Sequence, residues 1–209
     1  MNLFSKLLLA VLAGSAVLSL AASSLPDNVV SCQANAGCTN RKMFDRDYKV
    51  LRTPRAEVMV SISTEGAYTR ADISILNNDG FPINITPDDF RVEVVSPKPH
   101  VLSYITPANL QGVPPDPPVV EAPAPVALVK ADPTHPLNID ELYAAKKKQM
   151  ALQEAADRAA AQRNLAAVSV KPNEVVRGRV YFERDKRATQ VNLTIPIAGM
   201  VYQFPYTLQ

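Results

Sequence analysis

Nine of the 18 prolines in this chain fall between residues 107 and 136, and they divide the sequence into two differently patterned parts. Proline has no backbone N–H donor and a fixed φ, so a segment this rich in proline cannot join a sheet ladder or continue a helix. Its spacing favours an extended polyproline II course. We therefore predict a spacer at residues 107–136.

On both sides of this spacer, apolar residues alternate with polar ones. Val58, Val60 and Ile62 show the pattern before it, and Val191 and Leu193 show it afterwards. A period of two is that of a half-buried β-strand. The predicted strands lie near residues 48–51, 58–63, 70–75, 90–94, 176–183, 191–195 and 200–204. Because turn residues separate most of them, the pattern predicts a mainly β chain with an antiparallel sandwich of about seven strands.

Residues 138–168 contain neither proline nor glycine and are rich in alanine and other strong helix formers. Asn138 and Glu141 resemble a capping box at the start of a helix. Thirty helical residues would measure about 45 Å, against roughly 30 Å for a small domain, so part of the helix is expected to extend beyond the sandwich. The domain predicted over residues 43–209 is thus interrupted by an insert at 107–170, made of the spacer and this helix.

The predicted helix has a thin apolar stripe, formed by Ile139, Leu142, Tyr143 and Met150. Asp157 and Asn164 interrupt the stripe further on and leave mostly alanine. Two interpretations stay open. The helix is either a solvated element whose first half docks on the sandwich, or a surface for a partner or for self-association.

The first 24 residues are predicted to be an export signal, with a basic start at Lys6 and an apolar run over residues 7–22. The run is shorter than the roughly 20 residues that span a bilayer, so cleavage is expected and an uncleaved anchor is the alternative. No later stretch reaches spanning length. In an oxidising compartment, Cys32 and Cys38 are predicted to form a disulfide within an irregular arm over residues 25–42, with a redox-active pair as the alternative.

Composition excludes several classes of site. The seven glycines are isolated, so no dinucleotide-binding or phosphate-binding loop is present, and the two histidines and two cysteines cannot form a zinc site unaided. A formal charge of +2 does not favour a nucleic-acid partner. No cofactor or catalytic residue is predicted, since neither His100 nor His135 has a recognisable nucleophile context. The adjacent Asp88 and Asp89 leave a shallow carboxylate or cation site as an alternative.

Basic residues are concentrated between residues 177 and 187. They are Arg177, Arg179, Arg184, Lys186 and Arg187. On a hairpin, the first two would share an exposed face near the turn that carries the others, and the resulting positive patch would suit an acidic partner or an anionic envelope polymer. Charged residues that protect a sheet edge are the alternative. With Leu142, Tyr143 and Met150 of the helix, these residues form the candidate partner surface.

Four segments resemble the immunoglobulin-like sandwich domains of unknown function on secreted bacterial proteins and lipoproteins. They are ISILN at 73–77, PDDF at 87–90, GRVYF at 178–182 and VNLTIP at 191–196. The resemblance covers roughly residues 56–106 and 170–209, and the insert at 107–170 is foreign to it. It implies an immunoglobulin-like sandwich with a non-catalytic accessory role.

We therefore expect an exported, periplasmic or extracellular binding or assembly module of the cell envelope. Its expected partner is an envelope protein or an anionic envelope polymer. A structural subunit that self-associates through the helix is one alternative. An enzyme or cation-binding protein with a shallow carboxylate site is the other.

Overall fold

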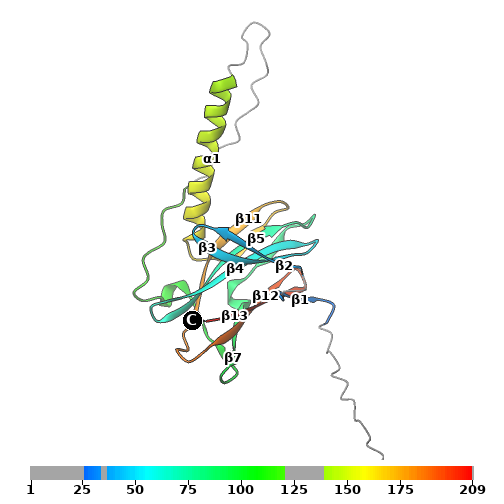
Figure 1. Ribbon diagram of the computed structural model, residues 1–209, viewed down its shortest axis with the longest axis vertical. Helices are drawn as coiled ribbons and strands as arrows, with labels where there is room; N and C mark the ends of the chain where they lie inside the picture. The colour runs from blue at the N-terminus through cyan, green and yellow to red at the C-terminus, as the bar shows by residue number, and fades with distance from the viewer. Residues whose placement is uncertain (1–25, 34–36, 121–138, 209) are drawn as a thin grey trace, which may run out of the picture.

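Two packed β-sheets form the body of the molecule, and one long helix stands on the outside of one of them (Figure 1). The computed structural model describes residues 26–33, 37–120 and 139–208. In spatial order, the six-stranded sheet consists of β2 (Cys38–Met43), β3 (Arg46–Arg52), β4 (Ala56–Glu65), β5 (Tyr68–Asn77), β11 (Val175–Glu183) and β9 (Tyr104–Ile105). The five-stranded sheet consists of β1 (Val29–Ser31), β13 (Met200–Thr207), β12 (Gln190–Ile197), β7 (Arg91–Ser96) and β8 (His100–Leu102).

Three smaller features complete the described chain. Strand β6 (Ile83–Ile85) pairs with β10 (Val168–Val170) in a short ribbon. Two 3₁₀ turns span Pro87–Asp89 and Pro107–Asn109. Helix α1 spans Ile139–Ala161.

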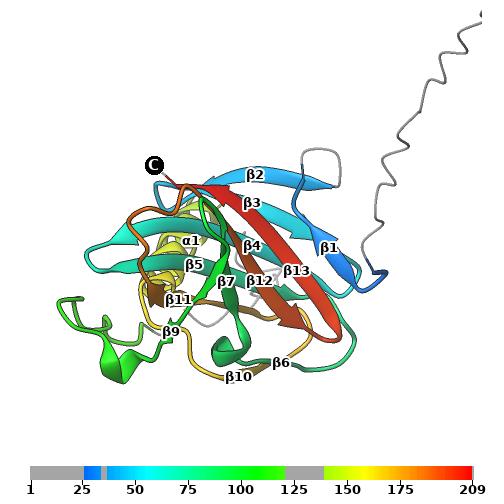
Figure 2. The same ribbon diagram turned by 90° about the horizontal axis from the view of Figure 1, so that it is seen from below.

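The strand order is that of an immunoglobulin-like sandwich. Strands β4, β5, β11 and β9 take the places of strands A, B, E and D in one sheet, and β13, β12, β7 and β8 take those of G, F, C and C′ in the other. Figure 2 shows the two sheets as stacked layers. Among the named strands, every pairing is antiparallel except that of β1 with β13. The predicted mainly β, antiparallel sandwich is confirmed, and the helix is inserted between strands D and E.

The seven predicted strands correspond to β3, β4, β5, β7, β11, β12 and β13. The described residues form six further strands, so the expected number was too low. Five of the six contain only two or three residues, too few to show a period of two. The sixth, β2, has mostly exposed polar residues and lacks the apolar half of the alternation.

The core lies between the two sheets. Inward-facing residues of β4 and β5, such as Val58 and Ile75, belong to one cluster with Leu193, Ile195 and Phe204 of the opposite sheet. None of these five side chains is accessible to solvent. Burying side chains of this size stabilises the fold by roughly 1.5–3 kcal/mol each, which makes the alternation the principal determinant of the sandwich.

The predicted irregular arm over residues 25–42 is wrong at residues 29–31 and 38–42, because the two sheets recruit these residues as strands. Strand β1 pairs in parallel with β13, and β2 forms a hairpin with β3. The pairing of β1 with β13 is long-range, so no local sequence pattern reveals it. The β2–β3 hairpin is local, but its turn residues Phe44 and Asp45 lack the usual Asn-Gly or Asp-Gly signal. The predicted disulfide is present: Cys32 and Cys38 are bonded, with their Cα atoms 4.8 Å apart. It joins the end of β1 to the start of β2, and therefore connects the edges of the two sheets.

Helix α1 ends at Ala161 rather than at residue 168, because the following residues run beside β11. The backbone N–H of Arg179 donates to the carbonyl of Arg163 (2.8 Å), and that of Leu165 donates to the carbonyl of Arg179 (2.9 Å). Leu165 is buried in the core and lies against Gly178. These tertiary interactions outweigh the helix propensity of the segment. No helix in the described part of the chain is long and apolar enough to cross a membrane.

The first part of the predicted spacer lies against the sandwich. The backbone N–H of Gln111 donates to the hydroxyl of Tyr68 at 2.9 Å. Asp116 accepts hydrogen bonds from both the backbone N–H and the side-chain amide of Asn164, each at 2.9 Å. The rest of the spacer, His135 and Asn138 lie outside the described residues, as does the predicted signal at 1–24.

Replacing Gly178 by alanine should destabilise the protein by roughly 1–3 kcal/mol, as overpacking does in well-packed sites. A Cβ at residue 178 would lie 2.8 Å from the Cα of Leu165, and this backbone is held by its hydrogen bonds to Arg179. Urea unfolding measures the effect. Gly80→Ala is the matched control, because nothing lies within 4 Å of a Cβ there. Equal stability of the two variants would contradict the proposed contact.

Removing the disulfide by Cys32→Ala and Cys38→Ala together should lower the free energy of unfolding by about 2 kcal/mol. The reason is the entropy that the short closed loop removes from the unfolded chain. Chemical denaturation of the oxidised protein and of the double variant tests this. A difference below about 0.5 kcal/mol would show that the link between the sheet edges does not contribute to stability.

Candidate functional site

The outer face of the six-stranded sheet carries a buried cluster of charged side chains. Alternation along β5 turns Ile73 and Ile75 towards the core, and Arg70 and Asp72 towards the outside. Despite this orientation, Arg70 and Asp72 are only 5% and 3% exposed. The register places Asp72 between Ser61 of β4 and Arg179 of β11.

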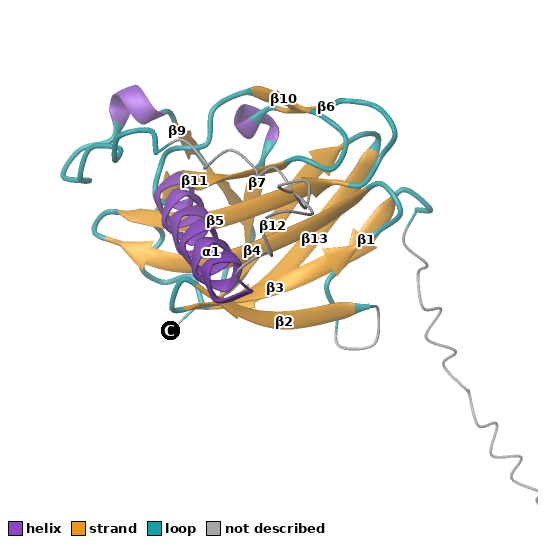
Figure 3. Cartoon of the chain, turned by 90° about the horizontal axis from the view of Figure 1, so that it is seen from above, coloured by secondary structure: helices purple, strands orange, loops and turns teal. Residues whose placement is uncertain are grey.

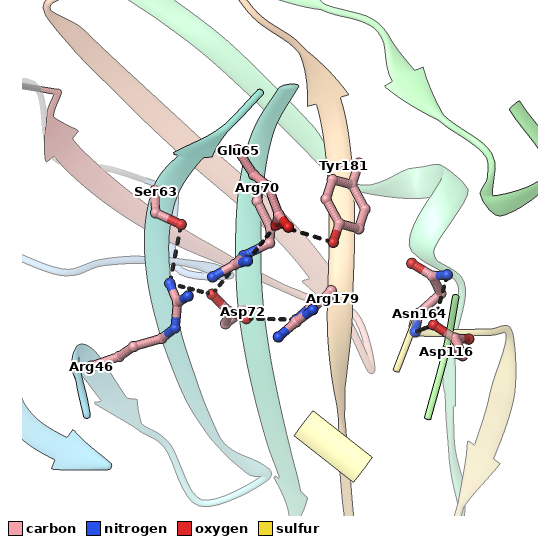
Figure 4. Close-up of polar contacts among 9 residues, drawn as sticks. All are labelled: Arg46, Ser63, Glu65, Arg70, Asp72, Asp116, Asn164, Arg179 and Tyr181. Atoms are coloured by element: carbon pink, nitrogen blue, oxygen red, sulfur yellow. Dashed lines mark hydrogen bonds and ion pairs between the residues drawn. The ribbon is translucent and has the colours of Figure 1, made fainter. Parts of the chain in front are cut away.

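Asp72 contacts three arginines that come from three strands (Figure 4). Its carboxylate lies 3.1 Å from Nη1 of Arg46, 3.2 Å from Nε of Arg70 and 3.4 Å from Nε of Arg179. Burial raises the pKa of Asp72, while the charges of Arg46 and Arg179 act in the opposite direction. A buried carboxylate is tolerated when it is paired and hydrogen-bonded in this way. Asp72 therefore ties β3, β5 and β11 together electrostatically.

A second carboxylate extends the cluster. Glu65 forms an ion pair with Arg70 and accepts a hydrogen bond from the hydroxyl of Tyr181 at 3.3 Å. Burial and the neighbouring charge of Glu65 raise the pKa of Tyr181 to about 12. Tyr181 therefore remains a neutral donor at physiological pH.

The last turns of α1 cover this cluster. Asp157 forms an ion pair with Arg177 of β11 at 3.0 Å. Arg158 forms one with Asp45 at 3.7 Å, in the turn between β2 and β3, and its guanidinium lies 5.7 Å from the centre of the Phe44 ring. Among the residues of α1, all of which the structure describes, only Ala156 is buried. The helix is thus seated at its carboxyl end, largely by charge, and the expectation that its first half docks on the sandwich is wrong.

A pocket of about 210 Å³ lies between the end of α1, the β2–β3 turn and the sheet. We call it the arginine pocket. Its lining consists of Phe44, Asp45, Arg46, Tyr48, Asp72, Arg158, Ala161, Gln162 and Arg179. Burial raises the pKa of Tyr48 to about 12, so its hydroxyl is also a neutral donor.

The opposite half of α1 projects away from the sandwich (Figures 1 and 3). The predicted residues Leu142, Tyr143 and Met150 are exposed by 48%, 69% and 57%. The structure adds two residues that sequence reasoning missed. Met43 and Phe44, in the β2–β3 hairpin, line a groove of about 510 Å³ together with Met150 and residues 153, 154 and 157 of α1. Turns are usually polar, so an adjacent methionine and phenylalanine at a turn were the sequence signal that could have indicated an exposed apolar contact surface.

The basic residues predicted to form one patch lie in two places. Arg177 and Arg179 face the charged cluster, where their side chains are only 18% and 19% exposed. Arg184, Lys186 and Arg187 lie in the loop between β11 and β12. The single exposed patch is therefore a wrong expectation, because α1 and Asp72 cover the two arginines of β11.

The β7–β8 hairpin adds two residues to the basic loop. Lys98 and His100 line a cavity of about 470 Å³ with Pro97, Arg184, Asp185 and Arg187. Nε2 of His100 lies 3.6 Å from the carboxylate of Asp185. His100 is the first residue of β8. Strands β11 and β12 belong to different sheets, so the hairpin expected at residues 177–187 is wrong. Only the fold brings the β7–β8 hairpin and the β11–β12 loop together.

The carboxylates Asp88 and Asp89 lie in an exposed 3₁₀ turn. Among the described residues, no group of three or more histidine, cysteine, aspartate or glutamate side chains is arranged to hold a metal ion.

Comparison with known proteins identifies no relative: no family model matches the sequence, and neither does any curated protein or solved structure. The resemblance to secreted bacterial domains therefore stays a prediction from sequence.

The variant Asp72→Asn should destabilise the protein by about 3 kcal/mol or more. Removing one partner of a buried ion pair leaves the other charges uncompensated, and here three guanidinium groups lose their shared carboxylate. Thermal and urea unfolding give the difference. Asp89→Asn is the control, because it removes the same charge from an exposed turn. The two variants would be equally stable if Asp72 were merely a surface residue.

Proposed function

We propose that this chain is an exported, non-catalytic binding or assembly module of the cell envelope, which engages a protein partner through helix α1. The observation that carries the proposal is the exposure of the helix. A helix of 23 residues, about 35 Å long, presents large apolar side chains to solvent, and its one buried residue, Ala156, lies near its carboxyl end. Helices in proteins gain most of their stability from packing an apolar face, so this arrangement fits an element that is completed by a partner.

The partner surface forms one continuous strip. Ile139, Tyr143 and Met150 lie on the same side of α1 by helical periodicity, and Met150 also lines the groove beside Met43 and Phe44. The strip thus runs from the amino-terminal end of the helix to the β2–β3 hairpin. Such spacing of apolar anchors is typical of a helix that binds in an apolar groove.

Basic residues accompany this strip. Lys146 and Lys147 lie on the same side of α1, and Lys42 lines the groove at the hairpin. A partner groove bordered by acidic side chains would be complementary in charge and would associate faster at low salt. We therefore propose an envelope protein with an acidic rim around an apolar groove.

Export is the second component of the proposal. The predicted signal at residues 1–24 and the Cys32–Cys38 disulfide support a periplasmic or extracellular location, because disulfides persist in oxidising compartments. The loop cluster of Lys98, Arg184, Lys186 and Arg187 supports a further contact with an anionic envelope polymer.

Self-association through α1 is the second candidate function. A different side of the helix forms a shallow hollow of about 390 Å³, lined by Ala151, Ala155 and Ala159 with three polar residues. Small side chains at a spacing of four residues let two helices approach closely. Sedimentation of the wild-type protein and of Ala155→Leu distinguishes the candidates, since a dimer through this hollow would be lost in the variant and a monomer would be unaffected.

The combined substitution Leu142→Ser, Tyr143→Ser and Met150→Ser should leave folding stability within about 0.5 kcal/mol of wild type, because exposed positions contribute little. It should weaken capture of the partner at least tenfold, as the loss of apolar anchors does. Photocrosslinking from position 143 in the native cells identifies the partner, and titration of the purified pair measures affinity. Leu152→Ser is the matched control, because Leu152 is exposed on the opposite side of the helix. Unchanged affinity in the triple variant, or no reproducible crosslink, would refute the proposal.

A further inference from the structure

The charged cluster beneath α1 contains one more positive than negative side chain. Its arginines are Arg46, Arg70, Arg177 and Arg179, and its carboxylates are Glu65, Asp72 and Asp157. Each of these side chains is at most 34% exposed. Each arginine has a carboxylate partner, but Arg46, Arg70 and Arg179 share Asp72, so the cluster keeps one excess positive charge. The carboxyl end of α1 supplies about half a negative charge, which does not complete the balance.

Several hydrogen-bond donors of the same cluster also lack an acceptor. Five buried side-chain atoms in the described part of the chain have no hydrogen-bond partner, and three of them are arginine nitrogens of this cluster: Nη2 of Arg70, Nε of Arg177 and Nε of Arg179. The last of these contacts Asp72 as an ion pair at 3.4 Å, outside good hydrogen-bond geometry. Buried donors are almost always satisfied, so an orphaned donor indicates a place for an acceptor. Of these three arginines, only Arg179 lines the arginine pocket.

The arginine pocket is the space that an acceptor for Arg179 would occupy, and Asp45 and Asp72 are the two carboxylates of its lining. Arg46 and Arg179 form its sheet side, and Arg158 and Gln162 contribute from the end of α1. Tyr48, only 3% exposed, lies on its wall and makes no side-chain hydrogen bond within the described residues. The volume of the pocket, about 210 Å³, is several times the roughly 30 Å³ that one water occupies in the liquid, so the pocket has room for more than a single water.

We propose that the arginine pocket binds an oxyanion, namely a carboxylate or phosphate group of a small ligand. Arg46 and Arg179 hold the anion by charge-assisted hydrogen bonds, and the hydroxyl of Tyr48 donates a further hydrogen bond to it. Arg158 closes the site from the helix. The planar guanidinium group suits both oxyanions, because its N–H donors match pairs of oxygen atoms. The negative charge balances the cluster, and the bound ligand links the end of α1 to the sheet.

Calorimetric titration of the purified mature chain with inorganic phosphate and, separately, with acetate tests the proposal in a low-salt buffer. We expect saturable binding of at least one anion, weakened by added sodium chloride as ion pairing predicts. The tighter of the two identifies the ligand class. The ¹⁵N resonance of Arg179 Nε should shift during the titration, which places the anion in the pocket.

Two variants and a control make the test specific. Arg46→Gln should reduce affinity tenfold or more, since it removes a charged hydrogen bond. Tyr48→Phe keeps the packing of the ring and removes only the hydroxyl, so it should reduce affinity about fivefold and remains informative if Arg46→Gln does not fold. Arg55→Gln changes the same charge away from the pocket and should bind as the wild type does. The proposal is overturned if neither anion binds saturably, which would indicate that water fills the pocket. It is also overturned if all variants bind equally, which would place the anion outside the pocket.

Discussion

The carboxylate of Asp72 holds the outer face of this sandwich together. It lies in the middle of a six-stranded sheet, on the side that an ordinary sandwich exposes to water, and it contacts arginines from its own strand and from two others. Three cations surround one anion, so ion pairs as well as backbone hydrogen bonds hold the strands of this face in position. This arrangement gives the carboxyl end of α1 a polar surface to contact, where Asp157 and Arg158 form ion pairs.

This polar contact at one end explains why α1 projects from the sandwich rather than packing along the sheet. A helix that packs along a sheet needs an apolar stripe along its whole length, and α1 offers a buried contact only at Ala156. Ion pairs fix its last turns, and the backbone bonds of residues 163–165 to β11 fix the exit. The free apolar residues then lie at the far end, where they can meet another molecule without disturbing the core.

Sequence patterns predicted the parts of this structure that follow from local periodicity. Alternation identified the seven longer core strands, and composition identified a helix flanked by the proline-rich segment. Neither could show that Arg46, Arg70 and Arg179 converge on Asp72, since residues 46 and 179 are brought together only by the strand order. For the same reason, Arg177 was assigned to the correct face of its strand but to the wrong environment. The end of α1 depended on Leu165, whose burial is a tertiary property. Met43 and Phe44 gained significance only when Met150 was found beside them.

The hydrogen bonds between Asp116 and Asn164 bring the two ends of the inserted segment to a single point on the sandwich. The 47 residues between them therefore leave the sandwich and return to it at almost the same place. Closing a loop becomes only slowly more costly with its length, by about 0.6 kcal/mol for each doubling. The stability of the sandwich therefore depends only weakly on the length of this segment. Its length can change in evolution or by design while strands D and E keep their positions.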